Sequence, residues 1–310
     1  MYNRENLLIQ TALLFYEKEM TQTEIAKKLK ISRPTVASLL KEAKDTGIVK
    51  ISIQHPSLHA FQRQQALEAE YGLDSVLVAP TSSSIEQTKA AIGELCATLV
   101  ESKLNDINNL GIGWGTTMHE FVQAASYTNF NHLNIVPLMG GVGISDMKYH
   151  SNHLVFSLAQ KYDCSVNYFY APAIAESQEM KLAFESSSLV QEVYQKGRSV
   201  DLAVIGVGNP IKSSTYRQLG FIDQEEAEAI DNSGAVGDIL ATFFDDDAEP
   251  VSTSISDRMI GIPLEDITKM KEVVVFAAGI EKADSVKALL SKKFIHHLII
   301  DDALAEALLT

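Results

Sequence analysis

The sequence predicts an α/β protein in two parts, an N-terminal winged helix-turn-helix and a larger domain built on a parallel sheet. One observation is a pair of short helices with cap signals at 21–47. Another is a series of β-rich runs that alternate with helical stretches from Ser75 onward. Strands that recur after helical crossovers indicate a parallel sheet covered on both faces. With 310 residues, 46% of them hydrophobic, the chain is long enough for two cores.

The first paired helix starts at a capping signal. Thr21 and Glu24 have the spacing of a capping box, in which the Thr hydroxyl accepts a first-turn N–H and the Glu reaches back to the cap. Ile25 and Leu29 then fall on one helical face. These residues predict a short amphipathic helix, and a preceding apolar helix at 3–16 would complete its core.

The second paired helix begins after a tight turn. Ser32 offers an N-cap, and Pro34 is tolerated because its missing N–H would have no helical partner there. Gly47 can adopt the left-handed conformation that often ends a helix. The inward stripe consists of Val36, Leu39, Leu40 and Ala43. Such a pair is typical of the helix-turn-helix, whose second helix enters a DNA major groove.

An ordinary pair of packed helices is the alternative. The alternating segment 48–53, which resembles a β wing, favours the DNA-binding interpretation, and so does charge. Residues 1–55 carry 9 Lys and Arg against 6 Asp and Glu, a net charge of +3, whereas the rest carries 17 against 34, a net charge of −17. Because the basic surplus lies on this part alone, double-stranded operator DNA is the expected partner. The expected contacts are Thr21, Gln22, Ser32, Arg33, Pro34, Thr35, Ser38 and Lys41.

Composition argues against several other classes. No apolar run reaches the ~18 residues of a membrane helix, and MYNRENLL is not a signal peptide, so we expect a cytoplasmic protein without a membrane partner. Cys96 and Cys164 stand singly in apolar contexts and are interpreted as buried small hydrophobic residues. Neither a metal site nor a cofactor is expected.

Pro56 marks the expected boundary between domains at 1–56 and 57–310. The helix predicted at 58–71 is mostly polar with a thin apolar edge, which is typical of a connector and would also allow pairing with a symmetry mate. Because a reader of two half-sites needs two copies, a homodimer or homotetramer is expected.

Glycines follow four strands of the larger domain. The expected strands are 75–79, 110–113, 133–139, 165–170, 202–206, 273–278 and 295–300, and the expected helices lie near 84–103, 116–126, 150–162, 185–196, 223–232, 283–290 and 301–309. The glycine groups are at 111–115, 140–143, 206–208 and 279. In a parallel sheet, ligands bind at the carboxyl strand ends, where glycines let backbone amides approach an anion. The four loops predict one pocket for a phosphate-type or polyol ligand.

Eight ordered segments carry a resemblance to a known family. They are ISRPTVASLLKEA at 31–43, GIGWGTT at 111–117, PLMGGVG at 137–143, HSNHL at 150–154, DLAVIGVGNP at 201–210, GAVGDI with FFD at 234–245, RMIGI at 258–262 and AAGIEK at 277–282. In these segments the chain resembles the SorC family of bacterial sugar-binding transcriptional regulators. The resemblance implies that 57–310 is an effector-binding and oligomerisation domain similar to sugar-phosphate isomerases, with ligand sensing in place of catalysis. The family includes repressors, so the resemblance also implies a regulator of a carbohydrate-utilisation operon, with repression or activation left open.

The resemblance implies roles for individual residues. Thr116, Thr117 and the amides of Gly113 and Gly115 correspond to a phosphate site, which Lys282 completes. The chemistry is reasonable because an ammonium and backbone amides suit a phosphate. Lys282 could instead be a solvated helix residue.

The sugar itself would be held by other residues. His150 and Asn152 fall in the segment that contacts the sugar, and Asp238 matches an acidic residue expected to hold hydroxyl groups. Asp238 and Asn152 could each instead cap a helix. The remaining expected contacts are Gly140, Gly141, Gly206 and Gly208.

Two positions depart from the family pattern. Met139 stands where relatives often carry Arg or Lys, which excludes an imine at this position and allows an effector without phosphate. Ser38 stands where relatives commonly have Arg, so the operator must differ or depend on Arg33 and Thr35.

A sugar-phosphate isomerase or deaminase-type enzyme is the main alternative, because the same fold serves both functions. Catalysis needs an acid/base pair, and only Asp238 and His150 are available, without a partner at known spacing. A DNA-binding structural protein without ligand would leave the glycine loops unexplained. The sequence therefore predicts a sequence-specific transcriptional regulator that responds to a sugar or sugar phosphate.

Overall fold

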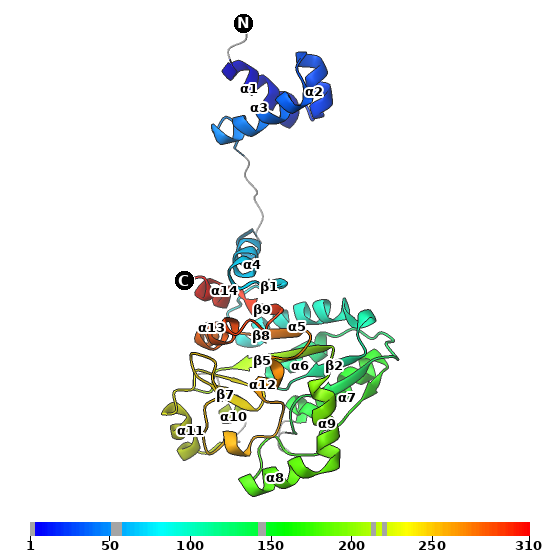
Figure 1. Ribbon diagram of the computed structural model, residues 1–310, viewed down its shortest axis with the longest axis vertical. Helices are drawn as coiled ribbons and strands as arrows, with labels where there is room; N and C mark the ends of the chain where they lie inside the picture. Colours follow the sequence, from blue (N-terminus) through cyan, green and yellow to red (C-terminus); the bar gives the residue numbers. More distant parts are fainter. Residues whose placement is uncertain (1–3, 51–57, 142–146, 212–214, 219–221) are drawn as a thin grey trace. The chain divides into compact units, whose positions relative to one another are not determined.

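The computed structural model describes residues 4–50, 58–141, 147–211, 215–218 and 222–310 (Figure 1). The chain divides into two compact units, Met1–Leu58 and His59–Thr310. The predicted boundary at Pro56 lies outside the described residues. Among the helices in the described ranges, none is long and apolar enough to cross a membrane.

The smaller unit contains the predicted helical pair. Helix α1 (Arg4–Ala12) and a π-helical turn (Leu13–Glu17) precede α2 (Gln22–Leu29) and α3 (Arg33–Asp45). The predicted helix at 3–16 is thus α-helical only to Ala12. The core of the smaller unit consists of Leu8, Ala12, Leu14, Ile25, Ala26, Val36, Leu39, Leu40 and Ala43.

Both predicted caps are confirmed. The N–H of Glu24 donates to Thr21 Oγ1 at 3.3 Å, and the N–H of Thr21 donates to Glu24 Oε2 at 2.9 Å. Ser32 Oγ accepts the N–H of Thr35 at 3.2 Å, and Gly47 has a φ of +77° beyond α3. Residues 48–50 of the expected wing form no strand, and 51–53 lie outside the described residues.

The larger unit is built on a parallel sheet in the order β1-β9-β8-β5-β2-β3-β4 (Figure 1). Its strands are β1 (Ser75–Ala79), β2 (Asn109–Ile112), β3 (Asn134–Pro137), β4 (Ser165–Val166), β5 (Leu202–Gly208), β8 (Val273–Ala277) and β9 (His297–Asp301). From β2 the chain moves outward to β3 and β4, then returns to β5 on the other side of β2 and continues to β8 and β9. Strand order therefore reverses between β2 and β5, and this switch point leaves a crevice at the carboxyl strand ends.

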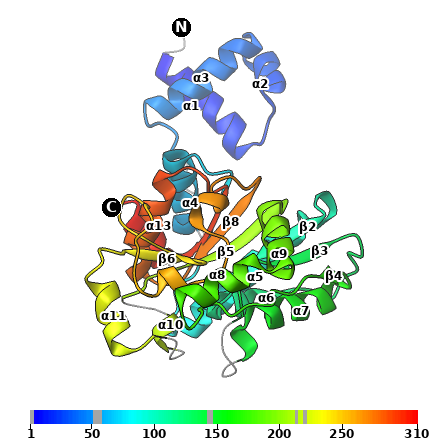
Figure 2. The ribbon, with the colours of Figure 1, turned by 60° about the horizontal axis from the view of Figure 1, so that its bottom comes forward.

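Helices cover both faces of the sheet, which confirms the predicted α/β class. Helices α5 (Ile85–Glu101), α6 (Thr116–Ala124) and α7 (Ser151–Tyr162) lie together on one face (Figure 2). Helices α9 (Ser188–Arg198) and α13 (Ala283–Ser291) cover the other face. Helices α4 (Leu58–Tyr71) and α14 (Asp302–Leu308) pack on the same side at the β1 edge. Strand β5 sends Leu202 and Val204 into one core and Ala203 and Ile205 into the other.

An antiparallel hairpin was not predicted. Strand β6 (Gly237–Ile239) pairs with the end of β5 and with β7 (Thr242–Phe244). Helices α8 (Gln178–Ser186), α10 (Thr215–Gln218) and α12 (Leu264–Ile267) were also missed, whereas α11 (Gln224–Asp231) was expected. Strands β6 and β7 and helices α10 and α12 have only three or four residues, which is too short to show a period, whereas the nine-residue α8 was simply not predicted.

Two predictions need correction. The strand expected at 165–170 ends at Val166, because the Asn152 amide donates to Phe169 O at 3.0 Å and accepts the N–H of Phe169 at 2.8 Å. Those backbone groups would otherwise extend the ladder. Both cysteines are free thiols, and Cys96 is buried as predicted, but Cys164 is only half-buried.

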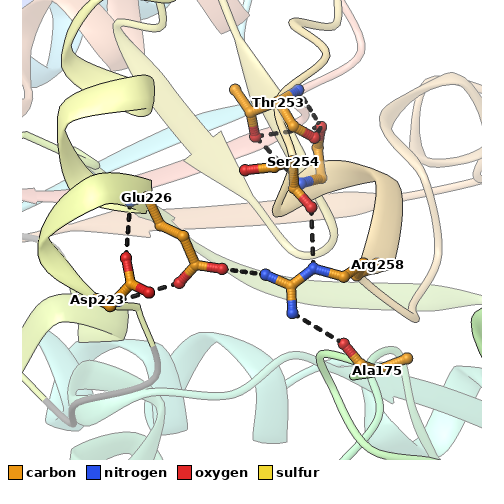
Figure 3. Close-up of polar contacts among 7 residues, drawn as sticks. Ala175, Asp223, Glu226, Thr253, Ser254 and Arg258 are labelled. Carbon is orange, nitrogen blue, oxygen red and sulfur yellow. Dashed lines mark hydrogen bonds and ion pairs between the residues drawn. The ribbon is translucent and has the colours of Figure 1, made fainter. Parts of the chain in front are cut away.

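Arg258 lies just before the segment that bridges to the second glycine loop, which begins at Gly140. It makes polar contacts with Glu226, Ser254 and Ala175 (Figure 3). Its guanidinium pairs with Glu226 of α11, donates from Nε to Ser254 O at 2.9 Å, and donates from Nη1 to Ala175 O at 3.1 Å. The next segment, 259–262, bridges to the start of that loop. One side chain thus joins helix α11, the turn at Ser254 and the segment that contains Ala175.

Candidate DNA-binding helix and effector pocket

A pocket lies at the switch point, where the chain leaves β2, β5 and β8. It is lined by Trp114, Gly115, Thr116, Thr117, Gly206, Val207, Gly208, Asp238, Leu240, Phe276 and Lys282. Three of the four predicted glycine loops therefore meet there. Among the described residues, the fourth loop contributes nothing to this lining.

The first loop presents the amino terminus of α6. Gly115 precedes the helix with a φ of +107°, a conformation that side chains other than glycine rarely adopt. Among the described residues no side chain caps α6, which leaves the first-turn amides of Thr116 and Thr117 available to an anion. Partial positive charge at a helix amino terminus favours the same ligand.

Lys282 lies at the pocket as a buried cation. It ends a 3-10 turn (Ile280–Lys282) that leaves Ile280 60% exposed and Lys282 only 9% exposed. Asn209 fixes this turn by donating to Glu281 O at 3.0 Å. Burial, with Lys89 nearby, lowers the pKa of Lys282 to about 8, so the side chain is still mostly charged at pH 7. The alternative of a solvated helix residue is wrong.

Asp238 supplies a carboxylate on β6 rather than a helix cap. A Cβ on Gly208 would lie 2.2 Å from Asp238 Oδ1, so glycine leaves room for the carboxylate. Oδ1 is shielded from solvent and has no hydrogen-bond partner among the described residues. Burial raises the pKa of Asp238 to about 6, although the Lys282 charge opposes the shift. Such an acceptor suits ligand hydroxyl groups.

Four residues that line the pocket were not predicted from the sequence: Trp114, Val207, Leu240 and Phe276. The Trp114 ring lies 4.9 Å from that of buried Tyr216, whose hydroxyl donates to Leu240 O at 3.0 Å and contacts Met139 Sδ at 3.8 Å. The position of Trp114 between two glycines of GIGWGTT was a usable signal. Leu240 had none, because the hairpin that carries it was not predicted.

Five expected effector contacts lie outside the described lining: Gly113, Gly140, Gly141, His150 and Asn152. The His150 ring packs on Gly141, and its Nδ1 accepts the N–H of Asn152 at 3.2 Å, so His150 caps α7. The cap suggested for Asn152 thus belongs to His150. The Asn152 amide is occupied by the backbone of Phe169.

The predicted DNA contacts lie at the starts of α2 and α3 and along the outer face of α3. Gln22 is half-buried, whereas the others are exposed: Thr21, Ser32, Arg33, Pro34, Thr35, Ser38 and Lys41. The Ser32 and Thr35 hydroxyls lie 2.7 Å apart, so each is partly used by the cap. Arg33 and Lys41 take part in none of the ion pairs found among the described residues.

Comparisons with known proteins agree with this arrangement. Residues 55–310 match the family model described as "Putative sugar-binding domain", and residues 12–50 match a winged helix-turn-helix DNA-binding model. The chain is 29% identical over 307 residues to the deoxyribonucleoside regulator of Bacillus subtilis, covering 98% of this chain and 97% of that protein. It is 27% identical over 306 residues to the sorbitol operon regulator of Klebsiella pneumoniae, with coverage of 98% and 97%.

Solved structures give the same result. The full-length sorbitol operon regulator SorC from Klebsiella pneumoniae superimposes with a TM-score of 0.76 at 26% identity, covering 98% of both chains. A DeoR family transcriptional regulator from Listeria monocytogenes has a TM-score of 0.75 at 31% identity, covering 80% of this chain and 98% of that chain. A helix-turn-helix followed by a sugar-binding domain over the full length leaves one assignment, and the chain belongs to the SorC family of sugar-binding transcriptional regulators.

Proposed function

We propose that this regulator binds the operator of a carbohydrate-utilisation operon and that a sugar phosphate in the switch-point pocket changes operator occupancy. One observation supports this most: an uncapped helix amino terminus, a buried lysine and a shielded carboxylate all line one pocket. The first two suit a phosphate, and the third suits hydroxyl groups. An unphosphorylated sugar or polyol is the second candidate, because Met139 supplies no cation.

Each group has a defined role in this proposal. The amides and hydroxyls of Thr116 and Thr117 bind the phosphate together with Lys282. Asp238 accepts hydrogen bonds from sugar hydroxyls, and Trp114 forms an apolar wall beside them. Met139 has no amine and its sulfur contacts Tyr216, so no imine with the ligand can form at this position.

We propose that the pocket senses its ligand and does not turn it over. The relatives are named as regulators. An isomerase needs a positioned acid and base within reach of the reacting atoms. Within the described lining no histidine accompanies Asp238, and His150 is used as a helix cap. Incubation with sugar phosphates followed by product analysis tests this, and turnover abolished by Asp238→Asn would contradict it.

We also propose that the regulator is cytoplasmic and acts as a homo-oligomer. A reader of two half-sites needs two copies of the helix-turn-helix, and a dimer or tetramer supplies them. Mass photometry of the full chain, alone and on DNA, tests this point, and a monomer in both samples would contradict it.

The only tryptophan of the chain lines the pocket, which provides a direct assay. Matched pairs of phosphorylated and free sugars are titrated against the full chain while Trp114 fluorescence is recorded. The same ligands are then added to a complex with a duplex that the chain selects from a random pool. We expect saturable fluorescence changes and altered DNA affinity for the same ligands. Ligands that alter DNA affinity without displacing each other at Trp114 would contradict the proposed site.

A further inference from the structure

Helix α4, which follows the helix-turn-helix in the chain, is bonded to α14 near both ends of α14. The Arg63 guanidinium pairs with Asp302 and donates to Glu306 Oε2 at 2.8 Å. At the other end the Tyr71 hydroxyl donates to Leu308 O at 3.3 Å. Fully buried Leu67 of α4 belongs to the same apolar cluster as the inner residues of α14. Helix α4 is therefore tied to the sheet edge through α14.

The residue before α14 joins this helix to the pocket. Asp301 is fully buried, and its Oδ2 accepts the N–H of Gly279 at 2.6 Å. Its Oδ1 accepts the Thr81 hydroxyl at 2.8 Å and the N–H of Leu304 at 3.3 Å. Thr81 in turn accepts the N–H of Ala303 at 2.8 Å. One carboxylate thus binds three segments of chain with both oxygens.

Gly279 opens the turn that carries Lys282. It has a φ of +102°, and its carbonyl accepts the N–H of Lys282 at 3.2 Å. A shift of this turn toward a bound anion must either move Asp301 or break its bond to Gly279. Since Asp302 is the next residue and pairs with Arg63, a movement of Asp301 reaches α4 within one residue.

We propose that Asp301 is a positioning residue that couples the effector pocket to α4 and hence to the DNA-binding end of the chain. The inference rests on the proposed function, because it takes Lys282 as a ligand contact. Charge-assisted bonds in a buried position are short and strong, so the carboxylate transmits small displacements. Coupling requires only that ligand binding favour one arrangement of the turn, α14 and α4.

The first test needs no ligand and uses hydrogen exchange in the full chain. Asp301→Asn keeps one acceptor oxygen but turns an NH₂ group toward a donor. We expect amides at 279–282, in the first turn of α14 and along α4 to exchange about tenfold faster. Asp266→Asn is the matched control, since it breaks an ion pair with Arg198 away from this path. Unchanged exchange at 279–282 or along α4 in Asp301→Asn would overturn the proposal.

Thr81→Val serves as a milder second variant, because Thr81 is exposed and loses only the hydroxyl that bonds Asp301 and Ala303. If Asp301→Asn fails to fold, Thr81→Val provides the test, and we expect the same amides to exchange about threefold faster in it. Faster exchange confined to the start of α14, with 279–282 unaffected, would again overturn it.

The second test adds inorganic phosphate, with chloride at equal ionic strength as reference. In the parent chain, protection at 116–118 and 279–282 should extend to α14 and α4, whereas in Asp301→Asn it should stay at the pocket. Protection of α4 that persists in the variant, or never reaches α4 in the parent, overturns the coupling. No protection at 116–118 in the parent refutes the phosphate site instead, and the ligand-free test then decides the coupling by itself.

Discussion

Replacing Lys282 by alanine should separate ligand binding from stability. The variant loses one charge-assisted contact to a phosphate, which should weaken a phosphorylated effector by roughly 2 kcal/mol, or about thirtyfold. Binding of the matching free sugar should change little. The same variant needs correspondingly more ligand to alter operator occupancy.

Stability should move the other way in Lys282→Met, which keeps the apolar stem. The pKa of Lys282 is lowered to about 8 in the folded chain, so the unfolded chain binds more protons between that pH and the ordinary lysine pKa. Lys282 therefore lowers the free energy of unfolding most below pH 8. The free energy of unfolding rises as the pH increases from about 8 to the ordinary lysine pKa. Removing the charge should raise the free energy of unfolding of the ligand-free protein at pH 7 by on the order of 1–3 kcal/mol.

Calorimetric titration of phosphorylated and free sugars, with thermal unfolding of the same samples, provides both measurements. Lys292→Ala is the control, because Lys292 pairs with Glu249 at the surface and lies outside the described lining. Equal weakening of both ligands would show that Lys282 shapes the pocket without contacting phosphate. Unchanged binding of both would place the phosphate elsewhere, and lower stability in Lys282→Met would refute the electrostatic reasoning.

Three further predictions concern the other groups. Asp238→Asn should weaken the binding of phosphorylated and free sugars alike. Because the pKa of Asp238 is raised to about 6, the buried carboxylate opposes folding above that pH. The variant should therefore have a higher melting temperature than the parent at pH 7 but not below pH 4, which calorimetry can check. Arg33→Ala should reduce discrimination between selected and random duplexes by about 1–3 kcal/mol, whereas Lys41→Ala should weaken both equally and lower the log–log salt slope by about 1; anisotropy titrations that show the reverse would exchange the two roles. The fragment 1–56 should bind the selected duplex far more weakly than the full chain at one salt concentration, and equal affinity would contradict oligomer-dependent binding.

Much of the architecture was predictable because strong local signals agreed with the tertiary environment. The capping box at Thr21 and Glu24 formed as expected, since both partners lie within one turn of chain. Strands β8 and β9 are buried along their whole length, and residues 273–277 and 298–300 form continuous apolar runs. The glycines after β2 and at the end of β5 indicated where the pocket lies, because the carboxyl ends of parallel strands share one edge.

What could not be predicted depends on contacts distant in sequence. Leu240 reaches the pocket only because β6 folds back antiparallel onto β5, and a three-residue strand has no recognisable period. The strand expected after Ser165 stops early because Asn152, on another helix, takes the backbone groups of Phe169. His150 was expected at the ligand, but its ring nitrogen caps α7. The outcomes at Leu240 and Phe169 are thus decided by segments distant in sequence, whereas the His150 cap forms with the N–H of Asn152, two residues away.

The two charged residues of the pocket, Lys282 and Asp238, differ from the other buried charges of the described chain in their bonding. Elsewhere in the described chain, fully buried Asp301 accepts three donors, and half-buried Glu272 pairs with Lys103 and His297. Among the residues that the structure describes, no hydrogen bond or ion pair is found for the Lys282 ammonium or for Asp238 Oδ1, and the pKa of each group is shifted in the direction that favours its neutral form. Burial without a partner opposes folding, so a scaffold under selection for stability alone would replace both. A ligand that carries an anion for Lys282 and hydroxyl donors for Asp238 removes both costs at once. The unfavourable electrostatics of the empty pocket and its affinity for such a ligand therefore have the same physical origin.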